Sequence, residues 1–155
     1  MTMKLVKTNG RNHDFLSLVK LLDQDLHERY GDLQKEYTPH NQLDDIHDVV
    51  LIYKDGVAAA CGAFKEFDSS TIELKRIFVE KAFRGQGLSK EIVRQLEQTG
   101  AEKGYVDAVL ETGTKQHEAI SLYKSAGYSA IPNYGPYIGK SASLCMKKSL
   151  INKEN

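Results

Sequence analysis

Apolar and polar positions alternate along the chain with two periods, which separate helical from extended segments. Between residues 12 and 30, apolar side chains recur at the three- and four-residue spacing of one helix face: Phe15, Leu18, Val19, Leu22 and Leu26. Gly31 is a suitable residue to end that helix. Residues 32–47 are polar and contain Pro39, so they predict either a second short helix or an ordered loop.

Extended segments precede and follow this helix. Their apolar and β-branched runs predict four strands, at residues 3–7, 49–54, 57–67 and 71–79. Asp55-Gly56 is a strong hairpin signal, because both residues tolerate a positive φ angle. Asp68-Ser69-Ser70 predicts the next turn. The last three of these strands therefore form an antiparallel meander.

The pattern then changes to alternating helices and strands. Helical spacing returns at Leu88, Ile92, Val93 and Leu96, and again at Ala119, Ile120, Leu122, Tyr123 and Ala126. Gly104 and Gly127 stand where helix C-terminal glycines belong. Strands are predicted at residues 105–111 and 142–147. A strand–helix–strand–helix run predicts a parallel crossover, so we expect an α+β fold with a mixed sheet.

The length of 155 residues fits a single domain over residues 1–155, without repeats or linkers. The formal net charge is zero, which argues against a nucleic-acid binder. No run approaches the roughly 20 apolar residues of a membrane span, and no signal peptide is seen, so we expect a cytoplasmic protein with no membrane partner. Cys61 and Cys145 are predicted to be buried, reduced thiols.

Charge is unevenly distributed along the chain. Residues 23–48 hold eight acids and two bases, a net charge of −6, whereas residues 75–103 hold seven bases and four acids, a net charge of +3. The histidines show no metal-ligand spacing, so no metal is expected.

The most informative stretch is Arg84-Gly85-Gln86-Gly87-Leu88-Ser89, between a strand and a helix. Glycines let a ligand approach the backbone, and the first helical turn offers free N–H groups and the positive end of the helix dipole. Such a loop suits a pyrophosphate. Taken alone, the glycines favour an ordinary turn into a helix. A dinucleotide fingerprint is excluded, because Lys90 occupies the place of its third glycine, and no P-loop pattern is present.

Two motifs together resemble the GNAT acetyltransferase superfamily. Arg84-x-x-Gly87-x-Ser89 resembles its acetyl-CoA motif, with Ser89 in place of Gly or Ala. Ala119-x-x-x-Tyr123, followed by Gly127-Tyr128, resembles its second signature. The similarity spans roughly residues 48–148, and the segments 110–113 and 131–135 resemble a bacterial branch without a firm substrate. The resemblance implies a mostly antiparallel central sheet flanked by helices, with a splayed strand pair at the cofactor site.

The resemblance also implies roles for individual residues. Backbone groups of Ile77, Phe78 and Val79 would bind the pantetheine arm of acetyl-CoA, if that strand has unpaired N–H and C=O groups. Residues 84–89 would hold the pyrophosphate: Arg84, Gly85, Gln86, Gly87, Leu88 and Ser89. Gln116, Ala119 and Tyr123 would also lie at the cofactor, although many relatives have Asn where Gln116 stands.

Two side chains are candidate catalysts. Tyr123 would protonate the departing thiolate, although a tyrosine at this spacing also suits a core position. Glu73 would take the proton of the attacking amine, or it is a strand-edge glutamate that pairs with Lys75 or is solvated. Strand alternation predicts that Glu73 shares a face with Lys75, Ile77 and Val79.

Further residues are candidates for the surroundings of the site. His117 is either a proton shuttle or a surface histidine. Tyr134 and Tyr137 lie in a loop that often helps to wall the acceptor site in this family, or they are packed aromatics in a turn.

We expect an N-acetyltransferase that uses acetyl-CoA to acylate a primary amine. The acidic segment 23–48 favours a small cationic acceptor, or it is a solvated acidic face. The alternatives are a protein or peptide N-acetyltransferase and a non-catalytic acyl-CoA-binding regulatory domain. An exposed C-terminal strand would favour a homodimer.

Overall fold

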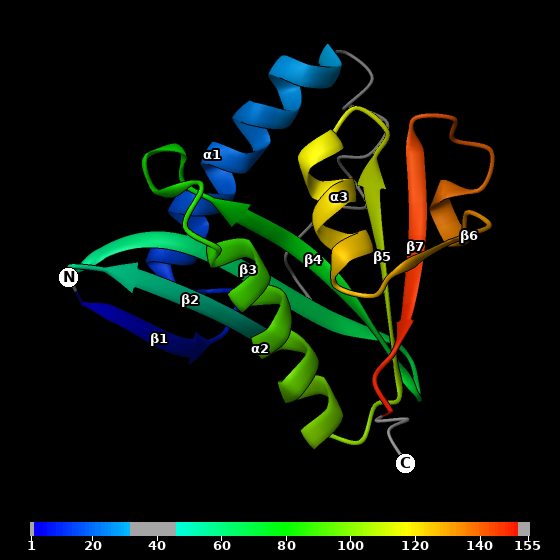
Figure 1. Ribbon diagram of the computed structural model, residues 1–155, viewed down its shortest axis with the longest axis horizontal. Coiled ribbons are helices and arrows are strands. Elements are labelled where there is room, and N and C mark those ends of the chain that lie inside the picture. Colours follow the sequence, from blue (N-terminus) through cyan, green and yellow to red (C-terminus); the bar gives the residue numbers. More distant parts are fainter. Residues whose placement is uncertain (1, 32–45, 152–155) are drawn as a thin grey trace. The chain divides into compact units, whose positions relative to one another are not determined.

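The computed structural model describes residues 2–31 and 46–151. The elements, shown in Figure 1, follow the order β1 (Met3–Thr8), α1 (His13–Tyr30), β2 (Asp48–Lys54), β3 (Val57–Asp68), β4 (Thr71–Val79), α2 (Leu88–Glu102), β5 (Asp107–Gly113), α3 (His117–Ser125), β6 (Ser129–Ile131) and β7 (Ser143–Ser149). Short 3-10 turns, η3 (Lys81–Phe83) and η4 (Gly135–Tyr137), precede α2 and β7. Within these ranges, no helix is both long and apolar enough to cross a membrane.

The strands form one sheet in the order β1-β2-β3-β4-β5-β7-β6. Strands β4 and β5 run parallel, whereas β1–β2, β2–β3, β5–β7 and β6–β7 are antiparallel pairs. The predicted α+β fold with a mixed, mostly antiparallel sheet is therefore confirmed.

The chain divides into two compact units. Met1–Lys65 and Lys75–Leu96 form the first, and Glu66–Leu74 and Glu97–Asn155 form the second. Strands β3 and β4 and helix α2 pass through both units. The ladder between β4 and β5 covers Thr71–Leu74 and Asp107–Leu110, and beyond it β4 continues to Val79 and β5 to Gly113. The splayed pair, like the single domain over residues 1–155, stays a prediction.

Helix α1 supplies much of the core of the first unit. The Asn12 side chain caps the helix by accepting a hydrogen bond from the Phe15 N–H at 3.0 Å, which satisfies one of the open donors of the first turn. The predicted apolar face is buried against β2, β3 and β4, where it contacts Val49, Leu51, Cys61, Ala63 and Phe78. The helix ends at Gly31, as expected, with a positive φ angle of 55°.

The opposite face of β3 receives helix α2 because Gly62 has no side chain. Cys61 and Ala63 belong to the α1 core, so Gly62 between them points to the other face. A Cβ atom at Gly62 would collide with Ile92 and would lie 3.0 Å from the Leu96 Cδ1 atom. The missing side chain thus sets how closely α2 approaches the sheet.

Gly62→Ala is therefore expected to destabilise the protein by about 1–3 kcal/mol, the usual cost of an extra methyl group in a packed core. Thermal or urea unfolding measures the change. An unfolding midpoint for Gly62→Ala equal to that of wild type would show that the helix shifts at no cost.

In the second unit, β5 and β7 form the longest ladder, and β6 pairs with the outer side of β7. The sequence led us to expect that the C-terminal strand would be exposed. In the structure β7 is not a sheet edge, because β6 pairs with it. The three residues of β6 were not predicted. In the same unit, the Glu97 carboxylate accepts hydrogen bonds from the Tyr128 hydroxyl at 2.8 Å and from Lys148 Nζ at 2.9 Å.

Most predicted boundaries agree with the structure within two residues. Strand β5 begins at Asp107 rather than at Tyr105, because the Tyr105 N–H donates to the Gly100 carbonyl and the Val106 N–H donates to the Ser70 carbonyl. Asp55 and Gly56 form the predicted hairpin turn with φ angles of 51° and 83°. The prediction of a short helix or a loop at 32–47 falls almost entirely on residues 32–45, outside the described residues.

Candidate functional site

The loop that enters α2, in the first unit, is exposed and is shaped by two glycines. Gly85 and Gly87 have φ angles of 82° and 79°, a conformation that residues with a side chain rarely adopt. A Cβ atom at either position would meet nothing within 4 Å. Upstream, the Glu80 carboxylate fixes the start of the loop by accepting the Ala82 N–H at 2.7 Å. The loop therefore offers open backbone to an approaching ligand.

The first turn of α2 supplies anion-binding groups at the end of this loop. The first helical hydrogen bond runs from the Glu91 N–H to the Gly87 carbonyl, so the N–H groups before Glu91 have no partner within the helix. Glu91 itself would repel an anion, but Arg94 pairs with it at 2.6 Å and balances its charge. The helix start is thus suited to a phosphate group.

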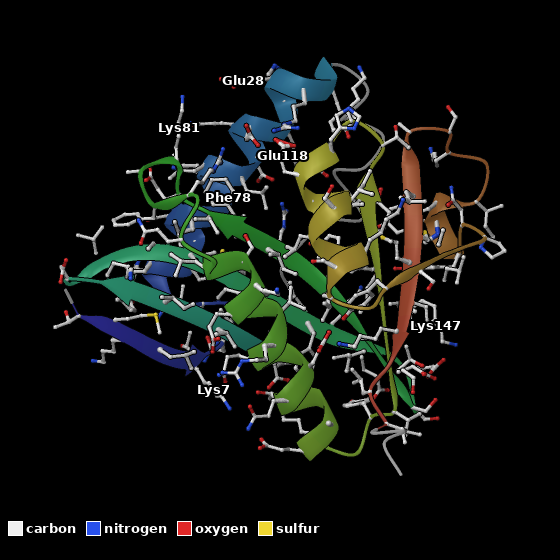
Figure 2. The ribbon with its side chains drawn as sticks, in the orientation of Figure 1. Lys7, Glu28, Phe78, Lys81, Glu118 and Lys147 are labelled. Carbon is white, nitrogen blue, oxygen red and sulfur yellow. The ribbon has the colours of Figure 1, made fainter. Side chains whose placement is uncertain are left out.

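Arg84 is held against the end of β4. Its Nε–H donates to the Val79 carbonyl at 3.0 Å, and its guanidinium lies 5.5 Å from the centre of the Phe78 ring. Phe78 is labelled in Figure 2, as is Lys81, an exposed side chain of the same loop. These contacts bring together the predicted pantetheine strand Ile77–Val79 and the predicted pyrophosphate loop 84–89.

Strand β4 is irregular at Arg76, which has a φ angle of 60°. The Arg76 side chain is 7% exposed and pairs with Asp23 of α1 at 2.6 Å. The backbone carbonyl of Arg76 accepts a hydrogen bond from the Cys61 thiol at 3.3 Å. A residue in this conformation interrupts the alternation of a strand. The predicted shared face of Glu73, Ile77 and Val79 was therefore wrong, because alternation does not extend across Arg76.

Tyr123 lies on α3, in the second unit, and only 7% of it is exposed. Its ring contacts Tyr128 edge to face, with 5.9 Å between the ring centres. Burial, and then the charge of Glu111, raise the pKa of the Tyr123 phenol, so it keeps its proton at neutral pH. Among residues 2–31 and 46–151, no group forms a hydrogen bond with its hydroxyl.

The turn between β5 and α3 is closed by Gln116. Its Oε1 atom accepts hydrogen bonds from the Thr112 hydroxyl and the Gly113 N–H, both at 2.9 Å. The side-chain oxygen of this predicted cofactor residue therefore shapes the turn. Ala119 is half-buried on α3, and His117 is exposed at the first position of the helix, close to Glu118, which Figure 2 labels in the first turn.

Glu73 is a buried carboxylate, 5% exposed, in the part of β4 that pairs with β5. Its Oε2 atom accepts a hydrogen bond from the Tyr134 hydroxyl at 2.7 Å. No second donor to Glu73 is found within the described ranges. The structure thus joins Glu73 to Tyr134, a residue 61 positions away, rather than to Lys75.

Tyr134 belongs to a loop, residues 133–143, that is held by its own backbone. The Asn133 amide Nδ2 donates to the carbonyls of Tyr137, Lys140 and Ser143 at 3.1–3.2 Å. Tyr137 is buried, and its ring lies 5.7 Å from that of Tyr134. The two tyrosines therefore pack in a turn, and one of them reaches a candidate catalytic residue; their place at an acceptor site stays a prediction.

Glu111 is a second acid in this region that the sequence did not suggest. Its carboxylate accepts the Ser143 hydroxyl at 2.7 Å, and its cross-strand neighbour on β7 is Cys145. Its charge contributes to the raised pKa of both Tyr123 and Cys145. The sequence signal is its place in the segment 110–113, which resembles a bacterial branch of the family. The structure adds that it follows Val109, the partner of Glu73 in the parallel ladder, by two residues.

The acidic segment 23–48 is only partly described. Asp23 pairs with Arg76, and Asp25 lies 3.6 Å from Arg29. These two charges are therefore balanced, and four of the eight acids lie outside the described residues. In the part of the chain that the structure covers, no group of His, Cys, Asp and Glu is arranged to hold a metal ion.

Comparison with known proteins supplies relatives for this arrangement. N-acetyltransferase family 8 member 2 of Rattus norvegicus is 41% identical over 69 residues, 44% of this chain and 30% of that protein. An IAA acetyltransferase of Azospirillum brasilense is 31% identical over 98 residues, 63% of this chain and 64% of that protein. The match thus spans less than two thirds of the length of either relative.

The fold is shared with a predicted acyl-CoA N-acyltransferase from Klebsiella pneumoniae subsp. pneumoniae. Its crystal structure matches with a TM-score of 0.80 and 26% identity, over 97% of this chain and 99% of that one. The model of the acetyltransferase (GNAT) family matches residues 15–128, which include the loop 84–89 and Tyr123. The chain therefore belongs to the GNAT acetyltransferase family.

Proposed function

We propose that this protein transfers the acetyl group of acetyl-CoA to a primary amine, and that the acceptor is a small cationic amine. The observation that carries the proposal is the exposed loop 84–87 at the start of α2, with two glycines of positive φ angle and no atom near their missing side chains. The relatives, acetyltransferases and an acyl-CoA N-acyltransferase, support the same donor.

The donor would be held by the loop 84–89 and by the end of β4. The N–H groups of Gly87, Leu88 and Ser89 would bind the pyrophosphate, and Arg84 would add a positive charge beside it. Backbone groups of Ile77 and Phe78 would bind the pantetheine amides. Acetyl-CoA supplies an activated thioester, so the remaining chemistry is to deprotonate the amine and to stabilise the departing sulfur.

Two side chains, those of Glu73 and Tyr123, would perform that chemistry. Glu73 would accept a proton from the amine, because an ammonium ion has no lone pair with which to attack. Tyr123 would donate its proton to the thiolate, since its raised pKa keeps the phenol protonated before the reaction. The amine nitrogen then forms the C–N bond and releases a second proton to water as the C–S bond breaks.

A cationic acceptor is favoured by the charge of the second unit near these residues. Glu73 and Glu111 are acids on the neighbouring strands β4 and β5, and the charges of both act on Cys145. Carboxylates in a partly dehydrated region attract an ammonium group more strongly than they would in water. This support is independent of the acidic segment 23–48.

The test is a thiol-release assay with acetyl-CoA and a panel of acceptors: putrescine, spermidine, tyramine, free amino acids and short peptides. Calorimetric titration of acetyl-CoA accompanies it. We expect saturable binding and faster CoA release with the diamines and polyamines than with the zwitterionic amino acids. Release with peptides alone would favour a peptide N-acetyltransferase. Binding without release for any acceptor would instead favour a regulatory acyl-CoA-binding domain.

A further inference from the structure

We propose that Tyr134 is a positioning residue for acetyl transfer: it holds the Glu73 carboxylate by one oxygen so that the other oxygen faces the acceptor amine. The proposal rests on the proposed function, in which Glu73 is the base. It concerns a residue outside both sequence motifs, in a loop 61 positions further along the chain.

The carboxylate of Glu73 has two oxygens in different situations. Oε2 accepts the Tyr134 hydroxyl at 2.7 Å, the short distance typical of a hydrogen bond to a charged acceptor. Oε1 accepts no hydrogen bond from residues 2–31 or 46–151. A carboxylate that is 5% exposed normally has its acceptors satisfied. The oxygen left over is therefore the one available to a proton of the acceptor or of a bridging water.

Tyr134 is suited to hold this carboxylate without exchanging a proton with it. Burial, followed by the charge and hydrogen bond of Glu73, raises the pKa of the Tyr134 phenol. The phenol therefore remains a donor across the range in which enzymes of this kind act. A donor that does not ionise fixes orientation and leaves the proton transfer to Glu73.

Two aromatic rings and the backbone of the loop hold the Tyr134 phenol in place. Phe67 meets its ring edge to face with 4.9 Å between ring centres, and Tyr137 does so at 5.7 Å. The backbone before the ring is fixed by Asn133, whose amide donates to three carbonyls of the same loop. A side chain locked by packing can impose its geometry on a catalytic group, which a mobile one cannot.

The bond and proton changes of the reaction balance without a proton from Tyr134. One ammonium proton goes to Glu73 Oε1, and the C–N bond forms with loss of a second N–H proton to water. The C–S bond breaks, the thiolate receives the Tyr123 proton, and transfer of the Glu73 proton through water restores the phenol. Tyr134 keeps its O–H bond throughout. Its contribution is to hold Glu73 within reach of the proton, and misplacing a catalytic group by 1 Å can cost about a hundredfold in rate.

The test compares Tyr134→Phe, Glu73→Gln and the double variant, with spermidine as the acceptor probe. Tyr134→Phe keeps the ring and its contacts with Phe67 and Tyr137 but removes the donor. We expect its kcat to fall about tenfold or more, with the KM for acetyl-CoA within about twofold of wild type. In the Glu73→Gln background the same change should have almost no further effect, because the group it positions is gone.

Tyr105→Phe is the matched control. The Tyr105 hydroxyl donates to Glu66 at 2.6 Å, so the variant removes a similar tyrosine–glutamate hydrogen bond elsewhere in the same unit. Its kcat is expected to equal that of wild type. Thermal unfolding of all variants shows whether any loss reflects folding.

The outcomes separate the two proposals. If Glu73→Gln is as fast as wild type, Glu73 is not the base and the proposed role of Tyr134 ends with it. If Glu73→Gln is slow, two results overturn only the positioning role. One is a Tyr134→Phe variant with the kcat of wild type. The other is a double variant whose kcat falls below that of Glu73→Gln by the same factor as Tyr134→Phe falls below wild type. No release by wild type with any acceptor of the panel would overturn both.

Discussion

Tyr123→Phe is expected to lower kcat for acetyl transfer by about a hundredfold, the lower end of what general acid–base catalysis contributes. The variant removes the one proton donor proposed for the CoA thiolate. It keeps the ring and hence the edge contact with Tyr128, so folding should be preserved. Thiol release under saturating acetyl-CoA measures kcat, and calorimetry should give an unchanged dissociation constant for acetyl-CoA.

Tyr53→Phe provides the control for this experiment. It removes a tyrosine hydroxyl from the first unit, where that hydroxyl donates to Asp14 at 2.6 Å, and it should leave kcat unchanged. A Tyr123→Phe protein that binds acetyl-CoA normally and transfers acetyl as fast as wild type would falsify the role of Tyr123 as the acid. The phenol would then be a core residue, as a tyrosine on an apolar helix face often is.

Gly87→Ala is expected to weaken acetyl-CoA binding by at least about tenfold. A side chain at a φ angle of 79° is strained by roughly 1–2 kcal/mol, so the loop will tend to leave the conformation that presents its N–H groups. The added methyl group also stands where the pyrophosphate is proposed to approach. Calorimetric titration of acetyl-CoA measures the effect, which should appear in binding before it appears in kcat.

Gly104→Ala separates strain from ligand approach. Gly104 lies just beyond the C-terminal end of α2 and has a φ angle of 97°. A methyl group added at Gly104 would meet no atom within 4 Å, and the same is true at Gly87. Both substitutions should lower the unfolding temperature by a similar amount, but only Gly87→Ala should weaken binding. Equal binding by the two variants would mean that the loop does not contact the donor.

The local parts of the fold could be predicted because their signals lie within a few residues. The apolar face of α1, from Phe15 to Leu22, is buried as its spacing indicated. Asp55-Gly56 turns the chain between β2 and β3 because of backbone conformations that each residue tolerates by itself. The loop 84–89 was found in the same way, from two glycines before a helix and the family motif that contains them.

The remaining features depend on partners far away in the chain. Arg76 adopts a positive φ angle without being glycine, and its pairing with Asp23 across 53 positions leaves no local pattern. The hydrogen bond between Tyr134 and Glu73 is likewise invisible in either segment alone. Strand β6 has three residues, too few to show a period, and without it β7 was taken for an edge.

The two cysteines have a practical consequence for the assays. Both are free and buried, and burial raises the pKa of the Cys61 thiol to about 12 and also raises that of Cys145. Only the thiolate reacts with disulfide or alkylating reagents, so the folded protein should consume almost none of them. A chromogenic thiol reagent added to the reaction will therefore react with the CoA thiol released from acetyl-CoA and not with the cysteines of the folded enzyme. Conversely, a slow gain of colour in the absence of acetyl-CoA will report protein molecules that have unfolded and exposed their cysteines.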